Sequence, residues 1–423
     1  MTTLAERNAT RHEPGVPRLS EKTVERVLTA SLLLLTIGCA PSRVSRLPPT
    51  FHWGVATSGF QSEGFFPDSN WTRYAARHEP YRNSVDFFHR FRDDIALAAG
   101  TGVDTFRFSI EWARVMPKRG VVNETALRHY DEVFEALEQH HLTPMVTLLH
   151  FVVPGWVADE GGLERDAIVE AYVDFVKVVA QRYRGKKVWW VPLNEASVFL
   201  NFERRHGACR DEEVERAKDR LVAMHVKAYE VLHAVDPGAP VASNVVWEPF
   251  PASVVDDWLF DRIRQHLDFV AIDYYYSLAF DLSVVHAGRG QYWKVNFTPA
   301  AMLTALRDYH RRAPNLPVYV VENGMATDDG NPRRDGYTRS QHLMDHVHFV
   351  QRARDEGIDV VGFNVWSLTD NYEWGDYRNR FGLYTVDVAT DPALRRKETE
   401  AVETLRRLVK ERGAPEDFVP VKR

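Results

Sequence analysis

Short apolar runs alternate with helical segments from residue 51 almost to the C-terminus, and this alternation limits the possible folds more than any other feature. The runs are rich in Val, Ile, Phe and Trp, as expected for parallel strands that are covered on both faces. We predict strands at residues 51–57, 103–109, 143–149, 188–194, 240–246, 268–275, 317–322 and 360–366.

Helical patterns separate many of these strands. They lie at residues 125–141, 164–184, 211–235, 299–312 and 338–357. Acidic residues tend to open them and basic residues to close them, as the helix dipole favours. Strands that alternate with helices imply a parallel sheet, and eight repeats favour a closed (β/α)8 TIM barrel over an open doubly wound sheet. No Gly-rich phosphate-binding run follows the first strand, so nucleotide binding has no support.

No linker interrupts residues 51–412, although 423 residues are enough for two or three domains. We therefore expect a single catalytic domain at 46–412, followed by a loose C-terminal tail at 413–423. The net charge of −6 and the absence of a basic run argue against nucleic-acid binding. The two cysteines, Cys39 and Cys209, have no metal-ligand spacing and form no disulfide framework.

An N-terminal extension, residues 1–45, precedes the predicted barrel. Its residues 27–38 read VLTASLLLLTIG, too short to span a membrane, which needs about 20 apolar residues. The run matches the apolar region of a signal peptide, and Thr36 to Cys39 resembles a bacterial lipobox. This favours an exported lipoprotein with a lipid anchor on Cys39. The alternative is a helix packed outside the barrel of a cytoplasmic protein.

Polar side chains follow most of the predicted strands, at the end where such barrels hold their active sites. Cleavage of a glycosidic bond requires a proton donor for the leaving oxygen and a carboxylate opposite the anomeric carbon. Glu195 and Glu322 end the fourth and seventh strands and would face each other across the barrel. An ionised Glu322 would keep Glu195 protonated by repulsion, and Arg107 could keep Glu322 charged.

Each of the other candidate residues has a plain structural interpretation when taken alone. His150 would be a hydrogen-bonded structural histidine, Arg107 an ion-pair partner and Trp366 part of the core. The aromatic content of 12% suits packing as well as stacking on sugar rings. The convergence of these residues on one end of the same barrel is what favours a site.

Six stretches of the chain carry a resemblance to a known family. They are FHWGVATSGFQSEG (51–64), FRFSIEWARVMPKRG (106–120), TLLHFVVPGW (147–156), LNE (193–195), VENG (321–324) and VWSLTDNYEW (365–374). In these stretches and in their order the chain resembles glycoside hydrolase family 1, the β-glucosidase family, from about residue 50 to 410. The resemblance implies a TIM barrel that needs no metal or organic cofactor.

The resemblance also implies a role for each site residue. Glu195 would be the acid/base and Glu322 the nucleophile, with Tyr275 hydrogen-bonded to Glu322 beside Arg107. Trp366 would form the platform under the sugar ring. The hydroxyls of the glycon would be bound by Gln61, His150, Asn194, Glu373 and Trp374. Asp273 is a departure, since the family usually has Asn there, and a carboxylate adds negative charge near the catalytic pair.

We therefore expect a retaining exo-β-glycosidase that acts on β-glucosides, with β-galactosides and β-fucosides as further candidates. One alternative is a transglycosidase that uses the same site, and another is a sugar-binding barrel without catalysis. Glu373 argues against the phospho-glycosidase subtype of the family, which replaces this glutamate. Glu195 argues against the thioglucosidase subtype, which replaces the acid/base. The natural substrate, a small β-glycoside or oligosaccharide, and the oligomeric state are left open.

Overall fold

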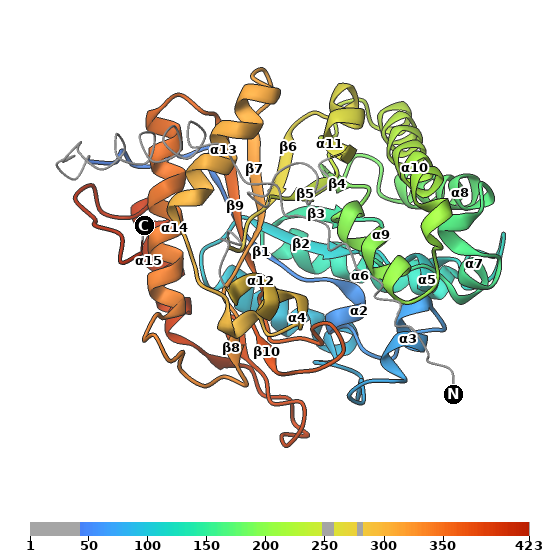
Figure 1. The fold of residues 1–423 in the computed structure, drawn as a ribbon, viewed down its shortest axis with the longest axis horizontal. Helices are drawn as coiled ribbons and strands as arrows, with labels where there is room; N and C mark the ends of the chain where they lie inside the picture. Colours follow the sequence, from blue (N-terminus) through green and yellow to red (C-terminus); the bar gives the residue numbers. More distant parts are fainter. Residues whose placement is uncertain (1–42, 248–257, 277–281, 423) are drawn as a thin grey trace, which may run out of the picture. The chain divides into compact units, whose positions relative to one another are not determined.

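Eight parallel strands form a ring that is surrounded by helices (Figure 1). The computed structural model describes residues 43–247, 258–276 and 282–422. In the sheet the strand order is β4-β3-β2-β1-β9-β7-β6-β5, and every neighbouring pair is parallel. The strands are β1 (His52–Ala56), β2 (Thr105–Ser109), β3 (Thr143–Thr147), β4 (Trp189–Val191), β5 (Asn244–Val246), β6 (Val270–Asp273), β7 (Val318–Asn323) and β9 (Val360–Trp366).

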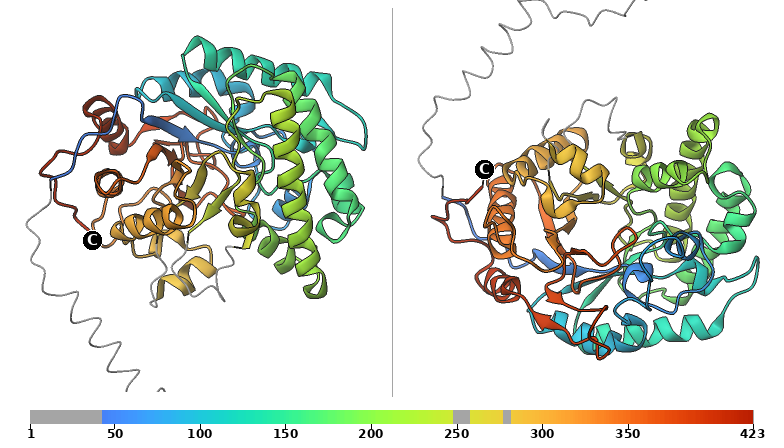
Figure 2. Two further views of the ribbon diagram at one scale, coloured as in Figure 1. Left: turned by 90° about the horizontal axis from the view of Figure 1, so that it is seen from above. Right: turned by 60° about the horizontal axis from the view of Figure 1, so that its bottom comes forward.

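The two ends of this sheet, β4 and β5, meet and close the ring. Trp190 N–H donates to the Pro240 carbonyl at 2.8 Å, and the Trp190 carbonyl accepts from Ala242 N–H at 3.0 Å. A second parallel bridge joins Asn194 to Asn244. The views in Figure 2 show the helices on the outside of the ring. The predicted (β/α)8 barrel is therefore confirmed, and each predicted strand overlaps an observed one.

One outer helix follows each barrel strand and packs outside it. These helices are α4 (Phe87–Ala99), α6 (Glu124–Gln139), α8 (Ala167–Arg182), α10 (Val214–Val235), α11 (Trp258–Ile263), α13 (Ala300–Arg312), α14 (Arg339–Asp355) and α15 (Glu400–Glu411). Side-chain caps mark the N-terminal ends of two of these helices. The Asn123 side chain accepts from the backbone N–H groups of Thr125 and Ala126 at the start of α6, and Thr338 with Gln341 forms a capping box on α14.

Short elements lie in the connections between the barrel strands and these outer helices. The α-helices are α2 (Gly59–Ser62), α3 (Asn70–Ala75), α5 (Trp112–Val115), α7 (Gly155–Asp159), α9 (Ala196–Arg205) and α12 (Leu282–Gly288). The 3-10 helices are η1 (Gly162–Glu164), η2 (Asp211–Glu213), η3 (Arg264–His266) and η4 (Tyr292–Lys294). Two antiparallel pairs join β8 (Thr327–Asp328) to β10 (Asn379–Arg380) and β11 (Tyr384–Thr385) to β12 (Lys397–Glu398). Most of them follow the carboxyl ends of the strands, where they surround the mouth of the barrel.

The C-terminal tail is docked, so the prediction of a loose tail was wrong. The backbone N–H groups of Val421 and Lys422 both donate to the Asp345 carboxylate of α14 at 2.9 Å. The Gln351 side chain of α14 holds Ala414 through both its amide atoms. The tail is polar and has no periodicity, so the sequence pattern did not reveal this attachment.

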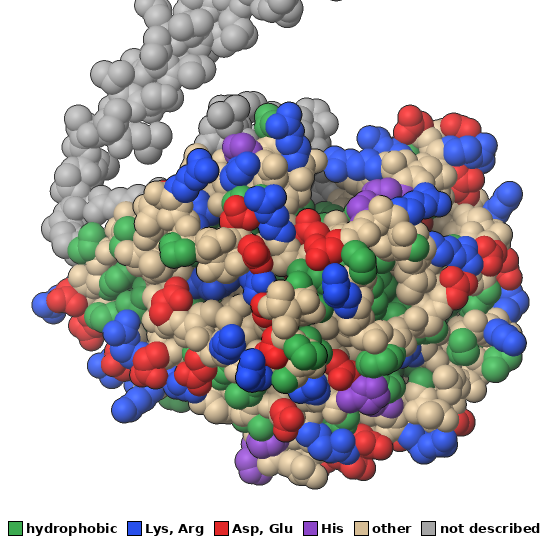
Figure 3. Space-filling view, turned by 90° about the horizontal axis from the view of Figure 1, so that it is seen from below, with side chains coloured by type: hydrophobic (Ala, Val, Ile, Leu, Met, Phe, Trp, Pro, Cys, Tyr) green, Lys and Arg blue, Asp and Glu red, His purple; other side chains and the backbone are tan. Residues whose placement is uncertain are grey.

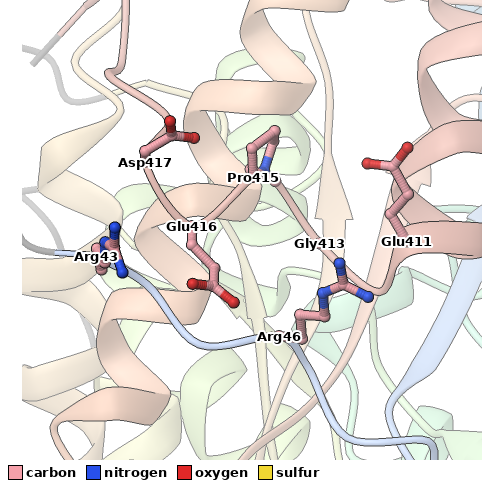
Figure 4. Close-up of a pocket in the computed structure, with 8 residues that line it drawn as sticks. Arg43, Arg46, Glu411, Gly413, Pro415, Glu416 and Asp417 are labelled. Atoms are coloured by element: carbon pink, nitrogen blue, oxygen red, sulfur yellow. The ribbon is translucent and has the colours of Figure 1, made fainter.

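The barrel unit begins at Arg43, three residues before the predicted boundary. Residues 43–47, here named the N-terminal strap, run beside the tail. Val44 N–H donates to the Glu416 carbonyl at 3.0 Å and Leu47 N–H to the Arg412 carbonyl at 2.8 Å. The strap and the tail enclose a charged pocket lined by Arg43, Arg46, Glu411, Gly413, Ala414, Pro415, Glu416 and Asp417 (Figure 4).

The predicted signal segment and Cys39 lie outside the described residues. Within residues 43–422, apart from the two gaps, no helix is long and apolar enough to cross a membrane. Cys209 is buried and not in a disulfide. On the face shown in Figure 3, Lys and Arg side chains are interspersed with Asp and Glu and form no continuous basic area.

Candidate active site

The predicted site residues all lie at the carboxyl ends of the barrel strands or in the connections that follow them. Arg107 lies in β2, Glu322 near the end of β7 and Trp366 at the end of β9. The connections supply the rest: Gln61 after β1, His150 after β3, Asn194 and Glu195 after β4, Tyr275 after β6, and Glu373 and Trp374 after β9. A single end of the ring therefore holds every residue of the predicted set.

Both carboxylate oxygens of Glu322 are held by donors. Arg107 donates from Nη1 to Oε1, and the Tyr275 hydroxyl donates to Oε2 at 2.5 Å. Both Arg107 and Glu322 are buried. Two donors, one on each oxygen, fix the orientation of this carboxyl group. The hydrogen bond expected between Tyr275 and Glu322 is thus present.

Arg107 also orients a second candidate residue. Its Nη2 donates to Asn194 Oδ1 at 2.6 Å, and its Nε donates to Thr147 Oγ1 at 3.1 Å. One guanidinium therefore links β2, β3, β7 and the connection after β4. Thr147 was not among the predicted residues, although it is the polar residue that ends β3.

Glu195 immediately precedes α9 and has left-handed backbone geometry with φ of 40°. Its backbone N–H donates to the Asn244 carbonyl at 3.1 Å. Among the described residues, one carboxylate oxygen each from Glu195, Asp273 and Glu322 lies within 4.8 Å of the other two. Retaining glycosidases have carboxyl groups about 5–5.5 Å apart, whereas inverting enzymes need about 6.5–9.5 Å to admit a water. The nearest oxygens of Glu195 and Glu322 are thus closer than the separation that an inverting enzyme needs, which favours the retaining geometry.

Asn244 of β5 is a site residue that the sequence analysis missed. Its Nδ2 donates to Asn194 Oδ1 at 2.8 Å and also to Asp273 Oδ2. It is buried and thus connects the amide next to Glu195 with the unusual carboxyl of β6. The signal was the Ser-Asn pair inside the apolar run 240–246: neighbouring side chains of a strand point to opposite faces, so one of the two had to face the barrel interior, and it is Asn244.

The rest of the predicted set forms an aromatic and amide-rich wall. Trp366 Nε1 donates to Glu373 Oε1 at 2.9 Å, and its ring stacks on His150 with centroids 5.7 Å apart and planes at 13°. The Gln61 amide accepts from Ser58 Oγ at 2.6 Å. A small pocket beside this wall is lined by Ser58, Phe60, Gln61, Trp71, His150, Phe151, Val152 and Trp374.

Burial shifts the titration of two residues in this wall. It raises the pKa of Glu373 to about 8, and the charge of Glu322 adds to the effect while the hydrogen bond from Trp366 opposes it. Burial, with the charge of Arg107, lowers the pKa of His150 well below its ordinary value. His150 is therefore a neutral imidazole at neutral pH, able to donate a hydrogen bond from one ring nitrogen and accept at the other.

The carboxylate oxygens of Glu195, Asp273 and Glu322 are close enough to contact one cation. Arg107 already donates to Glu322 and supplies a positive charge there. We therefore assign no metal to this site.

Comparison with known proteins agrees with this fold and places the chain among glycosidases. The model for glycosyl hydrolase family 1 matches residues 43–248 and 280–414. The aryl-phospho-β-D-glucosidase BglC of Bacillus subtilis is 26% identical, over 86% of this chain and 94% of its own. β-Glucosidase A of Thermotoga maritima is also 26% identical, over 82% of this chain and 94% of its own.

Solved structures show the same architecture. The β-glucosidase from Thermotoga maritima in complex with methoxycarbonyl-substituted glucoimidazole superposes with a TM-score of 0.75 at 24% identity, covering 88% of this chain and 100% of that one. The family match, which covers both halves of the barrel, establishes that the chain belongs to glycosyl hydrolase family 1.

Proposed function

We propose that this chain is a retaining exo-β-glycosidase that hydrolyses β-glucosides, and in addition β-galactosides or β-fucosides, by double displacement. The observation that carries the proposal is the arrangement of Glu322. Its two oxygens are held by Arg107 and Tyr275, with Glu195 within 4.8 Å. This is the geometry of an oriented, ionised nucleophile beside an acid/base.

The reaction would proceed in two steps at these carboxyl groups. In the first, Glu322 attacks the anomeric carbon to form a glycosyl ester while Glu195 gives its proton to the leaving oxygen. In the second, Glu195 removes a proton from water, which attacks the same carbon and releases Glu322. Two inversions at one carbon leave its configuration unchanged.

Asn194 is proposed to bind the 2-hydroxyl of the sugar. Its Oδ1 accepts from Arg107 and from Asn244 at 2.6 and 2.8 Å, which leaves its Nδ2 group as the donor for substrate. A hydrogen bond to the 2-hydroxyl strengthens as the transition state forms. The proposed contacts with the remaining hydroxyls come from Gln61, His150, Glu373 and Trp374, with Trp366 under the ring.

The proposed substrates are not phosphorylated, in contrast to those named for the B. subtilis relative. None of the residues that line the small pocket beside Gln61 and Trp374 is Lys or Arg. Glu373 offers oxygens that suit hydroxyl donors. A phosphate group on the sugar would require cationic side chains beside Glu373 and this pocket.

Release of nitrophenol from a panel of nitrophenyl glycosides, in both anomers, tests the proposal. We expect turnover of β-glycosides only, and NMR at early times should show the β-anomer of the free sugar. Product analysis with an added alcohol separates hydrolysis from transfer. Transfer without hydrolysis would identify a transglycosidase, and binding without turnover of any member would indicate a sugar-binding barrel.

We also propose that Cys39 carries a lipid after removal of residues 1–38. The support is the apolar run 27–38 and the lipobox-like Thr36 to Cys39. Mass spectrometry of the membrane fraction should show a chain that begins at a lipidated Cys39. Cys39→Ser is the matched control and should lose the membrane association. A membrane-bound protein that retains Met1 would contradict the proposal.

A further inference from the structure

The candidate catalytic centre contains more carboxyl groups than cations. Glu195, Asp273 and Glu322 are buried with oxygens within 4.8 Å of one another. Arg107 directs its donors to Glu322, Asn194 and Thr147. Three ionised carboxylates around one guanidinium would leave two uncompensated negative charges in a buried site, which is strongly unfavourable.

The contacts indicate which carboxyl group is the least suited to carry a charge. Glu322 accepts from two donors, one of them cationic. Asp273 is fully buried and accepts one bond, from the neutral amide of Asn244 on Oδ2. Its Oδ1 has no hydrogen-bond partner among the described residues. A carboxylate with one neutral donor and two acidic neighbours is poorly stabilised.

The groups that face Asp273 come from every neighbouring part of the barrel. Arg107 lies on β2, Asn244 on β5, Glu322 on β7, Glu195 after β4 and Tyr275 after β6. Burial, and then the charges of Glu322 and Glu195, raise the pKa of Asp273 well above its ordinary value, while Arg107 and Asn244 oppose this. The electrostatic balance therefore agrees with the contacts.

We propose that Asp273 is a neutral carboxylic acid in the active enzyme and that its ionisation sets the alkaline limit of activity. The proposal rests on the glycosidase function proposed above. A neutral carboxylic acid is close in shape to the amide of asparagine and, like it, has both a donor and an acceptor. When Asp273 ionises, it competes with Glu322 for Arg107 and with Asn194 for Asn244, and so disturbs the groups that hold both catalytic residues.

The deciding experiment is the pH dependence of kcat/KM for wild type and Asp273→Asn. The substrate is 2,4-dinitrophenyl β-glucoside, whose leaving group needs no proton from Glu195. The wild type should lose activity on the alkaline side as Asp273 ionises. In Asp273→Asn the alkaline limb of the pH profile, where kcat/KM falls, should move up by at least about one pH unit, because the amide cannot ionise. A limb at the same pH in both proteins would overturn the proposal.

Glu203→Gln is the matched control. Glu203 is a buried carboxyl on α9 that accepts from Asn70 Nδ2 at 3.0 Å, and burial raises its pKa to about 7. It is outside the carboxylate cluster. Its replacement also removes one buried acid and should leave the alkaline limb in place. An equal shift in both variants would show a general effect of buried acids and would reject the specific role of Asp273.

Infrared spectroscopy tests the protonation directly and does not depend on turnover. With aspartate labelled by ¹³C at the side-chain carboxyl, wild type at neutral pH should show the carbonyl band of a protonated aspartic acid, absent from Asp273→Asn. The label separates Asp273 from Glu111 and Glu373, whose pKa values burial raises to about 8.

If Asp273→Asn does not fold, the band in wild type should still disappear over the same pH range as the activity. The absence of any protonated aspartate at neutral pH would overturn the inference. A wild type with the band but no turnover of any glycoside would instead refute the proposed function.

Discussion

Glu322→Ala is expected to reduce kcat/KM by about 10⁵-fold or more for every β-glycoside. Without this carboxylate no glycosyl ester can form, whichever leaving group the substrate has. The loss should therefore be equal for dinitrophenyl and for alkyl or sugar leaving groups. Steady-state kinetics across such a series measures it.

Two controls separate chemistry from folding in this variant. Removal of Glu322 leaves Arg107 buried without its anionic partner, which costs about 3–5 kcal/mol in comparable cases. Glu322→Gln keeps the size of the side chain and an oxygen that can accept from Arg107, so this variant should fold better than Glu322→Ala and remain inactive.

Azide can occupy the space left in Glu322→Ala and attack from the same face as the missing carboxylate, which gives an α-glycosyl azide. A β-azide from this variant would contradict the assignment of the nucleophile.

Glu195→Ala should give a loss that depends on the leaving group. Substrates with alkyl or sugar leaving groups need the proton, and kcat/KM for them should fall by about 10²–10⁴-fold. The dinitrophenyl glycoside needs no proton, so its kcat/KM should change little. Its kcat should nevertheless fall, because the second step lacks the base that activates water.

Azide also distinguishes the two carboxyl groups of the catalytic pair. In Glu195→Ala it can enter on the side of the leaving group and attack the glycosyl ester on Glu322, giving a β-glycosyl azide. This is the opposite anomer from that expected for Glu322→Ala. Equal losses of kcat/KM across all leaving groups would show that Glu195 is not the acid/base.

The strands were predictable because continuous apolar runs are typical of buried parallel strands. The run 360–366 matches β9 in full, whereas the run 188–194 shortens to Trp189–Val191 because Pro192 has no backbone N–H for the ladder. Helix α4 was not predicted, although Phe87, Phe91, Ile95 and Ala98 follow one buried helical face. That periodicity was present in the sequence.

The candidate site was predictable as a set of residues, because barrel geometry brings all strand ends to one side. The hydrogen-bonded pairs within this set of residues were not predictable. Arg107 and Glu322 are 215 positions apart, and their contact depends on strand register and side-chain direction. Asn244 was missed for the same reason, since its importance lies in its bonds to Asn194 and Asp273.

The N-terminal strap determines where the chain enters the barrel. Ser45 N–H donates to Asp355 at the end of α14, Leu47 N–H donates to the Arg412 carbonyl after α15, and β1 begins at His52. These contacts place the strap on the side where the strands begin, opposite the mouth. The chain therefore joins the barrel on the face opposite the mouth, and the strap leaves the strand ends that hold the candidate catalytic residues uncovered.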